Sequence, residues 1–266
     1  MSAEPTRAEL GYFGPGSVTW RIHAEPVTLI GGLRALLLQA LHPQAMAKLA
    51  ATSNYREAPW DRLHRTGLYV ATLAFAPRAD VDHAAARVRA IHARLGIDDT
   101  DQLVWVHACE LDSFLASARR AGVPLTDADA DRYVGEQLVA ARLVGIPDGL
   151  APADTAQLRD YFAAMRPRLR LTADARLAAR TVLAPPLSVP LPWRLPARLG
   201  WSGVGALAVG MLPGWARRLY RIPSLPGSGA LNAASLRALR LGTQTLPARL
   251  RQGPLYRDAL ARAAVA

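Results

Sequence analysis

The helical pattern that decides the fold of this chain is clearest in Val81-Asp-His-Ala-Ala-Ala-Arg-Val-Arg-Ala-Ile-His-Ala-Arg-Leu95. Apolar side chains recur there at positions 81, 84, 88, 91 and 95, which are three or four residues apart. An α-helix turns once in about 3.6 residues, so these side chains form one stripe along a helix. Asp80 can cap that helix and Gly96 can end it. The stretch therefore predicts an amphipathic helix over 81–95.

Other segments of the chain carry helical signals of the same kind. Alanine, leucine and arginine dominate the composition and favour helices, whereas runs of β-branched residues are scarce. The pattern predicts helices over 25–50 (interrupted at His42-Pro43), 60–75, 102–121, 126–145, 152–165 and 169–181, and one or two basic helices over 230–266. We therefore expect an all-α protein, with a multi-helix domain at 1–230 and a basic helical extension at 231–266 packed on the same domain.

Two segments of the C-terminal half need separate treatment. Five prolines lie between Ala184 and Pro196, which predicts a crossing strap or a linker and argues against a regular helix there. The next 18 residues, Leu199 to Ala216, carry no charge, and this length is the minimum for a membrane span. Several glycines weaken the segment as a helix. A buried helical hairpin that walls a pocket is favoured over a span.

Charge and cysteine content narrow the class of protein. The net charge is +11 and comes almost entirely from arginine, since Lys48 is the only lysine. The arginines are scattered, which argues against a nucleic-acid partner, and an anionic ligand or an anionic membrane surface remain as alternatives. Cys109 is the only cysteine, so an intramolecular disulfide and a cysteine-based zinc site are excluded. Residues 1–10 lack the layout of a signal peptide, and we expect a cytoplasmic protein.

All six histidines fall between His23 and His107, which places any histidine-based metal or proton chemistry in that part of the chain. His92 lies at the edge of the apolar stripe, and Arg89 shares its side of the helix. One interpretation is a hydrogen-bonded core histidine beside an arginine that reaches solvent. The other is a metal ligand, with Arg89 neutralising a nearby anion. Haem suits the second, because its iron takes a histidine and its propionates pair with arginine.

Three further groups are candidates for the same site. His107 shares an apolar helix face with Leu103 and Leu111, with Glu110 three residues later, so it is either a core residue or a ligand. Non-haem iron at His92, His107 and Glu110 is a low-ranking alternative, because the repeated Glu-x-x-His of di-iron bundles is absent. Arg62, Arg65 and Thr66 share a helix face that is either solvated or functional. His42 precedes Pro43 and can cap a turn.

Six segments in a fixed order resemble the MpaB-like and latex-clearing-protein family of haem b oxygenases. They are Gly14-Pro-Gly-Ser-Val-Thr-Trp-Arg21, Leu36-Leu-Leu-Gln-Ala-Leu-His42-Pro43, Arg62-Leu-His-Arg-Thr66, Val88-Arg89-Ala-Ile-His92-Ala93, Trp105-Val-His107-Ala108 and Leu212-Pro-Gly-Trp-Ala-Arg217. The resemblance covers about residues 11–222. It implies an all-α fold with a globin-like helical core.

The resemblance also implies roles for individual residues. His92 takes the place of the haem-binding histidine, with Arg89 as its partner arginine. Arg62 and Thr66 fall on the opposite, oxygen-binding side. Latex-clearing members have a lysine where this chain has Arg65, and arginine ligates iron poorly, so their lysine-bound state is not expected here.

Three other residues complete the predicted site. Arg21, like Arg89, is expected to pair with the haem propionates. His107 is expected at the haem pocket, and His42 on the oxygen-binding side as a catalytic candidate.

These inferences predict a haem b dependent oxidoreductase that uses O₂ or a peroxide, with an electron donor as a further candidate partner. Its expected substrate is a small, fairly apolar molecule, because the short chain and missing export signal argue against polyisoprene. One alternative is a non-enzymatic haem or small-ligand binding protein on the same fold. Another is a basic helical protein that associates with membranes or nucleic acid. No oligomeric state is predicted.

Overall fold

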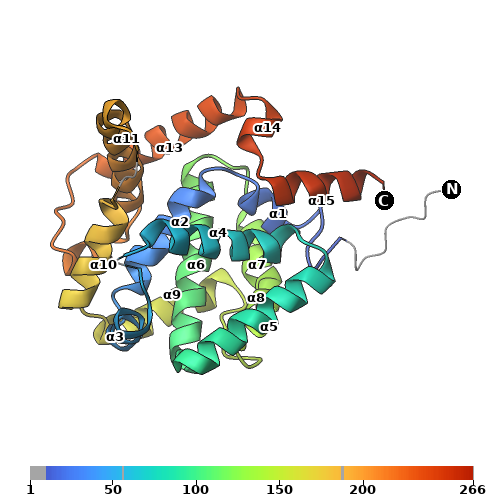
Figure 1. Cartoon of the computed structure of the whole chain (residues 1–266), viewed down its shortest axis with the longest axis horizontal. Coiled ribbons are helices and arrows are strands. Elements are labelled where there is room, and N and C mark those ends of the chain that lie inside the picture. The colour runs from blue at the N-terminus through green and yellow to red at the C-terminus, as the bar shows by residue number, and fades with distance from the viewer. Residues whose placement is uncertain (1–9, 56, 187–188, 266) are drawn as a thin grey trace.

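A computed structural model describes residues 10–55, 57–186 and 189–265 of the chain. Within these ranges every regular element is a helix (Figure 1). This result confirms the predicted all-α, single-domain fold.

The centre of the molecule is the pair α2 (Thr28–Gln39) and α6 (Thr100–Arg120), which make the most extensive contact of any two helices described. Leu37 and Leu38 of α2 and Trp105 and Leu111 of α6 are almost completely buried in the main hydrophobic core. Gly31 lets the helices approach closely, because a Cβ there would lie 2.7 Å from Ser117 Oγ. The core is therefore built where the predicted helices over 25–50 and 102–121 meet.

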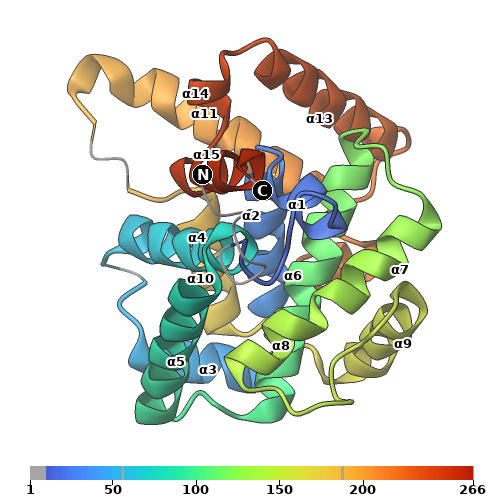
Figure 2. The same cartoon turned by 90° about the vertical axis from the view of Figure 1, so that its right-hand side faces the viewer.

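The remaining helices surround this pair (Figures 1 and 2). One group, α3, α10 and α11, lies at one end of the molecule, with α5, α7 and α8 toward the other. Helix α15 packs on α4, and α13 packs on α6 and α11. Their bounds are α1 (Val18–His23), α3 (Pro43–Thr52), α4 (Pro59–Phe75), α5 (Arg78–Leu95), α7 (Asp127–Glu136), α8 (Leu138–Val144), α9 (Thr155–Met165), η1 (Arg166–Arg168), α10 (Ala173–Leu183), α11 (Leu191–Gly210), α12 (Gly214–Leu219), α13 (Ser228–Gln244), α14 (Ala248–Arg251) and α15 (Pro254–Ala264).

Local capping explains where the structure divides the predicted helix over 25–50. Helix α2 ends at Gln39, and α3 begins at Pro43, which lacks the amide hydrogen that would continue α2. His42 adopts an extended backbone, and its Nδ1 accepts a hydrogen bond from the Ala45 amide at 3.2 Å.

The short helix α1 was not predicted. Its N-terminus is held by Glu136, whose carboxylate accepts hydrogen bonds from the amides of Val18 and Thr19.

The prediction that prolines exclude a helix up to Pro196 is wrong for its second half. Helix α11 begins at Leu191 and contains Pro192 and Pro196. Pro192 is tolerated because first-turn amides have no intrahelical acceptor, whereas Pro196 removes one backbone hydrogen bond. Residues 199–216 form the rest of α11, a turn and the start of α12, and Leu199 is 66 % exposed, so the predicted hairpin is only partly buried. No helix in the described ranges is long and apolar enough to cross a membrane.

The C-terminal helices pack against the rest of the molecule. The expected boundary between 1–230 and 231–266 falls inside α13, which contacts α6 and α11. Arg240 of α13 pairs with Glu25 of the α1–α2 connection at 2.8 Å. The division of the chain at this boundary stays a prediction.

Candidate active site between α4, α5 and α6

The hairpin of α4 and α5 is packed tightly only near its turn. The buried residues of α4 are Ala74 and Phe75, and those of α5 are Val81 and Ala85. The far ends of the two helices carry Arg62 and Thr66 on α4 and His92 on α5, and none of these residues is fully buried. The structure therefore brings the two predicted motifs to the same, less tightly packed end of one hairpin.

His92 is half-buried, and its Nδ1 atom is buried without a hydrogen-bond partner among the described residues. Burial lowers the pKa of His92, the charge of Asp98 opposes this effect, and the charge of Arg62 lowers it further. The imidazole is thus kept neutral near neutral pH, which is the form that binds metals.

The basic motif of α4 faces the same end of the hairpin. The Nη1 atom of Arg62 donates to Ser53 Oγ at 2.8 Å, and burial together with the neighbouring Arg65 lowers the pKa of Arg62. Arg65 itself is exposed. Arg62 therefore places its charge close enough to influence His92, and Arg65 extends toward solvent.

Arg89 has a structural partner. Its Nη1 atom donates to the Leu143 carbonyl oxygen at 2.7 Å, near the C-terminus of α8. The charge of Arg89 also acts on the Tyr69 hydroxyl, whose pKa it lowers against a larger effect of burial. The structure thus places Arg89 beside α8 and within electrostatic reach of Tyr69.

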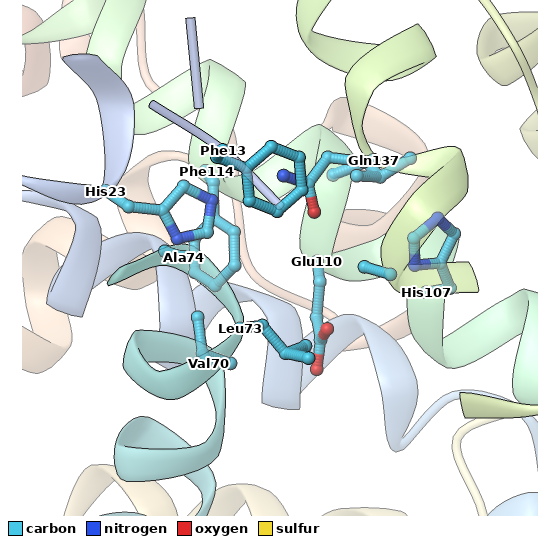
Figure 3. A pocket seen from close by; sticks show the side chains of 11 residues that line it. Phe13, His23, Val70, Leu73, Ala74, His107, Glu110, Phe114 and Gln137 are labelled. Carbon is cyan, nitrogen blue, oxygen red and sulfur yellow. The ribbon is translucent and has the colours of Figure 1, made fainter. Parts of the chain in front are cut away.

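A small cavity lies next to this hairpin, between α1, α4, α6 and the start of α8 (Figure 3). Its lining is mostly apolar and consists of Phe13, His23, Val70, Leu73, Ala74, His107, Glu110, Leu111, Phe114, Gln137 and Ala140. None of these residues comes from 199–216, and the role of those helices as a pocket wall stays a prediction.

Two ionisable side chains of α6 project into the cavity. His107 is 6 % exposed, its Nε2 atom has no partner in the part of the chain that the structure describes, and burial lowers its pKa to about 4. Burial raises the pKa of Glu110 to about 7, against the effect of a hydrogen bond from Gln39. Near neutral pH the cavity thus holds a neutral imidazole and a carboxyl group that retains much of its proton.

Tyr69 lies on α4 between Thr66 and the cavity-lining residue Val70. Its hydroxyl is buried without a described partner, and burial together with the charge of Glu110 raises its pKa to about 12. Unpartnered buried polar atoms are costly and rare in native proteins. Three of them, on Tyr69, His92 and His107, lie on the neighbouring helices α4, α5 and α6. A bound molecule or water in this region would supply the missing partners.

Two predicted site residues are not brought to this region by any described contact. Arg21 of α1 pairs with Asp129 of α7. His42 caps α3, and its Nε2 lies 3.5 Å from Asp101 Oδ2. The predicted roles of Arg21 beside haem and of His42 in catalysis stay predictions.

The low-ranking non-haem iron alternative is not supported. Among the described residues, His92, His107 and Glu110 are not arranged as a group that could hold a metal ion. Tyr69 is not among the predicted site residues, although the spacing 62, 66, 69 puts it on the same helix face as Arg62 and Thr66.

The fold and the site define a helical protein with a small, mostly apolar cavity next to the α4–α5 hairpin. The chain belongs to the family described as ER-bound oxygenase mpaB/B'/Rubber oxygenase, catalytic domain, whose model matches residues 20–246. This match confirms the resemblance and identifies the chain as an oxygenase-type catalytic domain. No match was found among curated proteins or among solved structures.

Proposed function

We propose that this protein is a haem b dependent oxygenase that acts on a small, fairly apolar molecule, with His92 as the iron ligand. The observation that carries the proposal is the buried, unpartnered Nδ1 atom of His92. It belongs to a neutral imidazole at the loosely packed end of the α4–α5 hairpin, in a chain of an oxygenase family.

The residues around His92 fit a haem group. A haem requires a neutral imidazole for its iron and cationic partners for its propionates, and both residue types are present. His92 would hold the iron, and Arg89 would pair with a propionate in addition to its contact with Leu143. Haem, when bound, supplies an iron centre that activates O₂ or a peroxide, and an electron donor would be a further partner.

The residues of α4 would act on the oxygen-binding side. Arg62 would stabilise negative charge that develops on oxygen atoms of the co-substrate, because a fixed cation at a partly desolvated site is effective there. The Thr66 hydroxyl, one helical turn further on, would donate to an oxygen atom or hold a water molecule. The apolar side chains of Val70, Leu73 and Phe114 would exclude other water from the cavity.

Haem binding tests the proposal directly. Purified protein, supplied with haem if needed, is expected to show a Soret band and to give the pyridine haemochrome spectrum of haem b. His92→Ala should weaken haem binding at least about tenfold, because the iron–imidazole bond is lost. His83→Ala, which changes an exposed histidine of the same helix, is the matched control and should bind haem normally. A protein without a Soret band, or a His92→Ala variant with full haem affinity, would refute the proposal.

A further inference from the structure

We infer that the first half of α11, residues 191–200, is a docking segment that lies on the surface of a bilayer with anionic lipids. This docking segment is the part of α11 that extends away from the rest of the molecule (Figure 2). The inference does not depend on the proposed function. It adds a partner, which is a layer of negatively charged head groups above acyl chains.

The large apolar side chains of the docking segment have little to pack against. Leu191, Trp193, Leu195 and Leu199 are between 64 % and 76 % exposed, and nine of the ten residues of the segment are exposed. The second half of α11 is partly buried instead, and the helix contacts α2, α10 and α13. Contact of several grouped apolar side chains with water is unfavourable, and such groups mark interaction sites. The docking segment therefore requires a partner.

The leucines and arginines of the docking segment form two neighbouring rows. Leu191, Leu195 and Leu199 are four residues apart, so they lie on one face of the helix. Arg194 and Arg198 are also four residues apart, and each follows a leucine by three residues, so they border the leucine row. An arginine can extend its charged end along such a helix toward head groups while its stem stays in apolar surroundings. This arrangement suits a helix at the boundary between head groups and acyl chains.

The net charge of the protein arises in the C-terminal region around the docking segment. Residues 175–257 contain twelve arginines and no aspartate or glutamate, whereas acidic residues balance the basic ones in the rest of the chain. Among the described residues, Arg240 is the one arginine of 175–257 that forms a salt bridge, with Glu25. The region therefore keeps a large positive charge, which is complementary to a surface of anionic lipids.

Two further helices extend the basic surface. In both views α13 and α14 lie on the same side of the molecule as α11 (Figures 1 and 2). They carry the same combination of exposed side chains, which are Leu231, Arg237, Leu241, Arg249, Leu250 and Arg251. A bilayer is a wide partner and can contact several helices at once, so these side chains add to the same binding surface.

The composition of this surface favours a bilayer over other anionic or apolar partners. The phosphates of DNA or RNA would pair with arginine, but they offer nothing to exposed leucines. A second copy of the chain would cover leucines, but it would bring two arginine-rich surfaces together, which is electrostatically unfavourable. In an anionic bilayer the phosphates pair with arginine, and the interface accommodates leucine and tryptophan.

Vesicle flotation tests the inference on the purified full-length protein. Vesicles made of equal parts phosphatidylcholine and phosphatidylglycerol are expected to bind the protein. Pure phosphatidylcholine vesicles should bind it at least about tenfold more weakly, because they lack the negative surface charge. Added salt should weaken binding to the anionic vesicles, because salt screens exposed charges. Equal binding to both kinds of vesicle, or binding to neither, would overturn the inference.

A leucine variant assigns the binding to the apolar row. Leu191→Ser combined with Leu195→Ser and Leu199→Ser should weaken binding to the anionic vesicles at least about tenfold, because less apolar area enters the interface. Leu150→Ser changes an exposed leucine between α8 and α9 and is the control. Circular dichroism checks that the helices are retained. A folded triple variant that binds like the wild type would refute the role of the row.

An arginine variant tests the charged row. Arg194→Gln combined with Arg198→Gln should weaken binding to the anionic vesicles at least about tenfold. The control, Arg87→Gln combined with Arg159→Gln, removes the same number of charges from exposed positions on α5 and α9 and should bind nearly as well as the wild type. Equal loss of binding in both double variants would show that the total charge matters and that the docking segment does not.

Hydrogen exchange on the unaltered protein covers the case in which a variant does not fold. With anionic vesicles the backbone amides of 191–200 should exchange more slowly, whereas those of α9, which lies far from α11 in Figure 2, should not change. Unchanged exchange at 191–200 would contradict the inference. So would protection of 191–200 by a DNA duplex, or by an increase in protein concentration, in the absence of vesicles.

Discussion

The Arg34 guanidinium of α2 donates through Nε to the Met211 carbonyl oxygen at 3.0 Å, which ties the central helix to the end of α11. The same guanidinium donates to Ser113 Oγ at 2.7 Å and pairs with Asp112 Oδ2 at 2.7 Å. Its side chain is only 4 % exposed. A buried charge of this kind is stable only while all its partners are present, so Arg34 holds three helices in one arrangement.

Removal of the Arg34 charge should destabilise the protein strongly. Arg34→Met would remove the ion pair with Asp112, whose side chain is 36 % exposed, and the hydrogen bonds to Ser113 and Met211, and we expect a loss of about 1–3 kcal/mol in the free energy of unfolding. Arg34→Lys should recover only part of it, because an ammonium cannot reproduce the planar set of donors. Chemical denaturation measures both. Arg119→Met, which breaks an exposed pair with Asp127, is the control and should cost less than about 1 kcal/mol.

Substitution by alanine should have opposite effects on stability at two adjacent glycines of α2. A Cβ at Gly31 would lie 2.7 Å from Ser117 Oγ and 2.9 Å from the Ser113 carbonyl oxygen, so Gly31→Ala must push α2 away from α6. We expect it to cost about 1–3 kcal/mol. At Gly32 the only close atom is Phe114 Cε1 at 3.9 Å, and Gly32→Ala should stabilise by up to about 1 kcal/mol through helix propensity. Equal thermal unfolding midpoints for the two variants would contradict the close helix contact.

Glu110 should make the protein less sensitive to acid. Its pKa rises from 4.5 in the unfolded chain to about 7 in the folded protein, so its contribution to stability is complete below pH 4.5 and is lost as the pH rises to about 7. The pKa values of His23 and His107 fall from 6.5 to about 4, so their contributions are present above pH 6.5 and are lost toward pH 4. Between pH 4.5 and 6.5 the Glu110 carboxyl therefore makes stability fall as the pH rises, whereas the two imidazoles make it rise.

Glu110→Gln removes the contribution of the carboxyl group to this pH dependence of stability. Between pH 4.5 and 6.5 the stability of the variant should rise more steeply with pH than that of the wild type, by a total on the order of 3 kcal/mol. Urea denaturation at a series of pH values measures the slope. Asp258→Asn changes an exposed carboxylate of α15 and serves as the control. Parallel curves for Glu110→Gln and the wild type would show that Glu110 is ionised in the folded state.

His42 should behave as a helix cap. Its Nδ1 atom accepts the Ala45 amide at the start of α3, so His42→Ala should cost about 1 kcal/mol. Asparagine is a strong N-cap residue, and His42→Asn should restore most of that loss. Thermal unfolding of the two variants checks the expectation, and an asparagine variant no more stable than the alanine variant would contradict it. A stable His42→Asn protein that binds haem but does not turn over would support the predicted catalytic role.

Much of the fold could be predicted from local signals. Helix α5 matches the predicted helix over 81–95 apart from three residues at its start, because its apolar spacing and Gly96 act within a few residues. The break between α2 and α3 was predicted from His42-Pro43, because this signal also acts within a few residues. The extent of α11 was not predictable, because two prolines in its first turns argue against a helix and only its packing on α2, α10 and α13 stabilises the rest.

The sequence by itself determined most of the helices, the family and the Arg-x-x-His and Arg-x-x-x-Thr motifs, because helical periodicity, capping and motif spacing depend on residues close together in the chain. Only the tertiary structure decided which polar groups are left without partners and which of them share a cavity. His107 became a cavity residue through the burial of its α6 face against α1, α4 and α8, and Arg21 was paired with Asp129, 108 residues away. Burial and the pKa changes that follow depend on contacts between distant segments, which no local pattern contains.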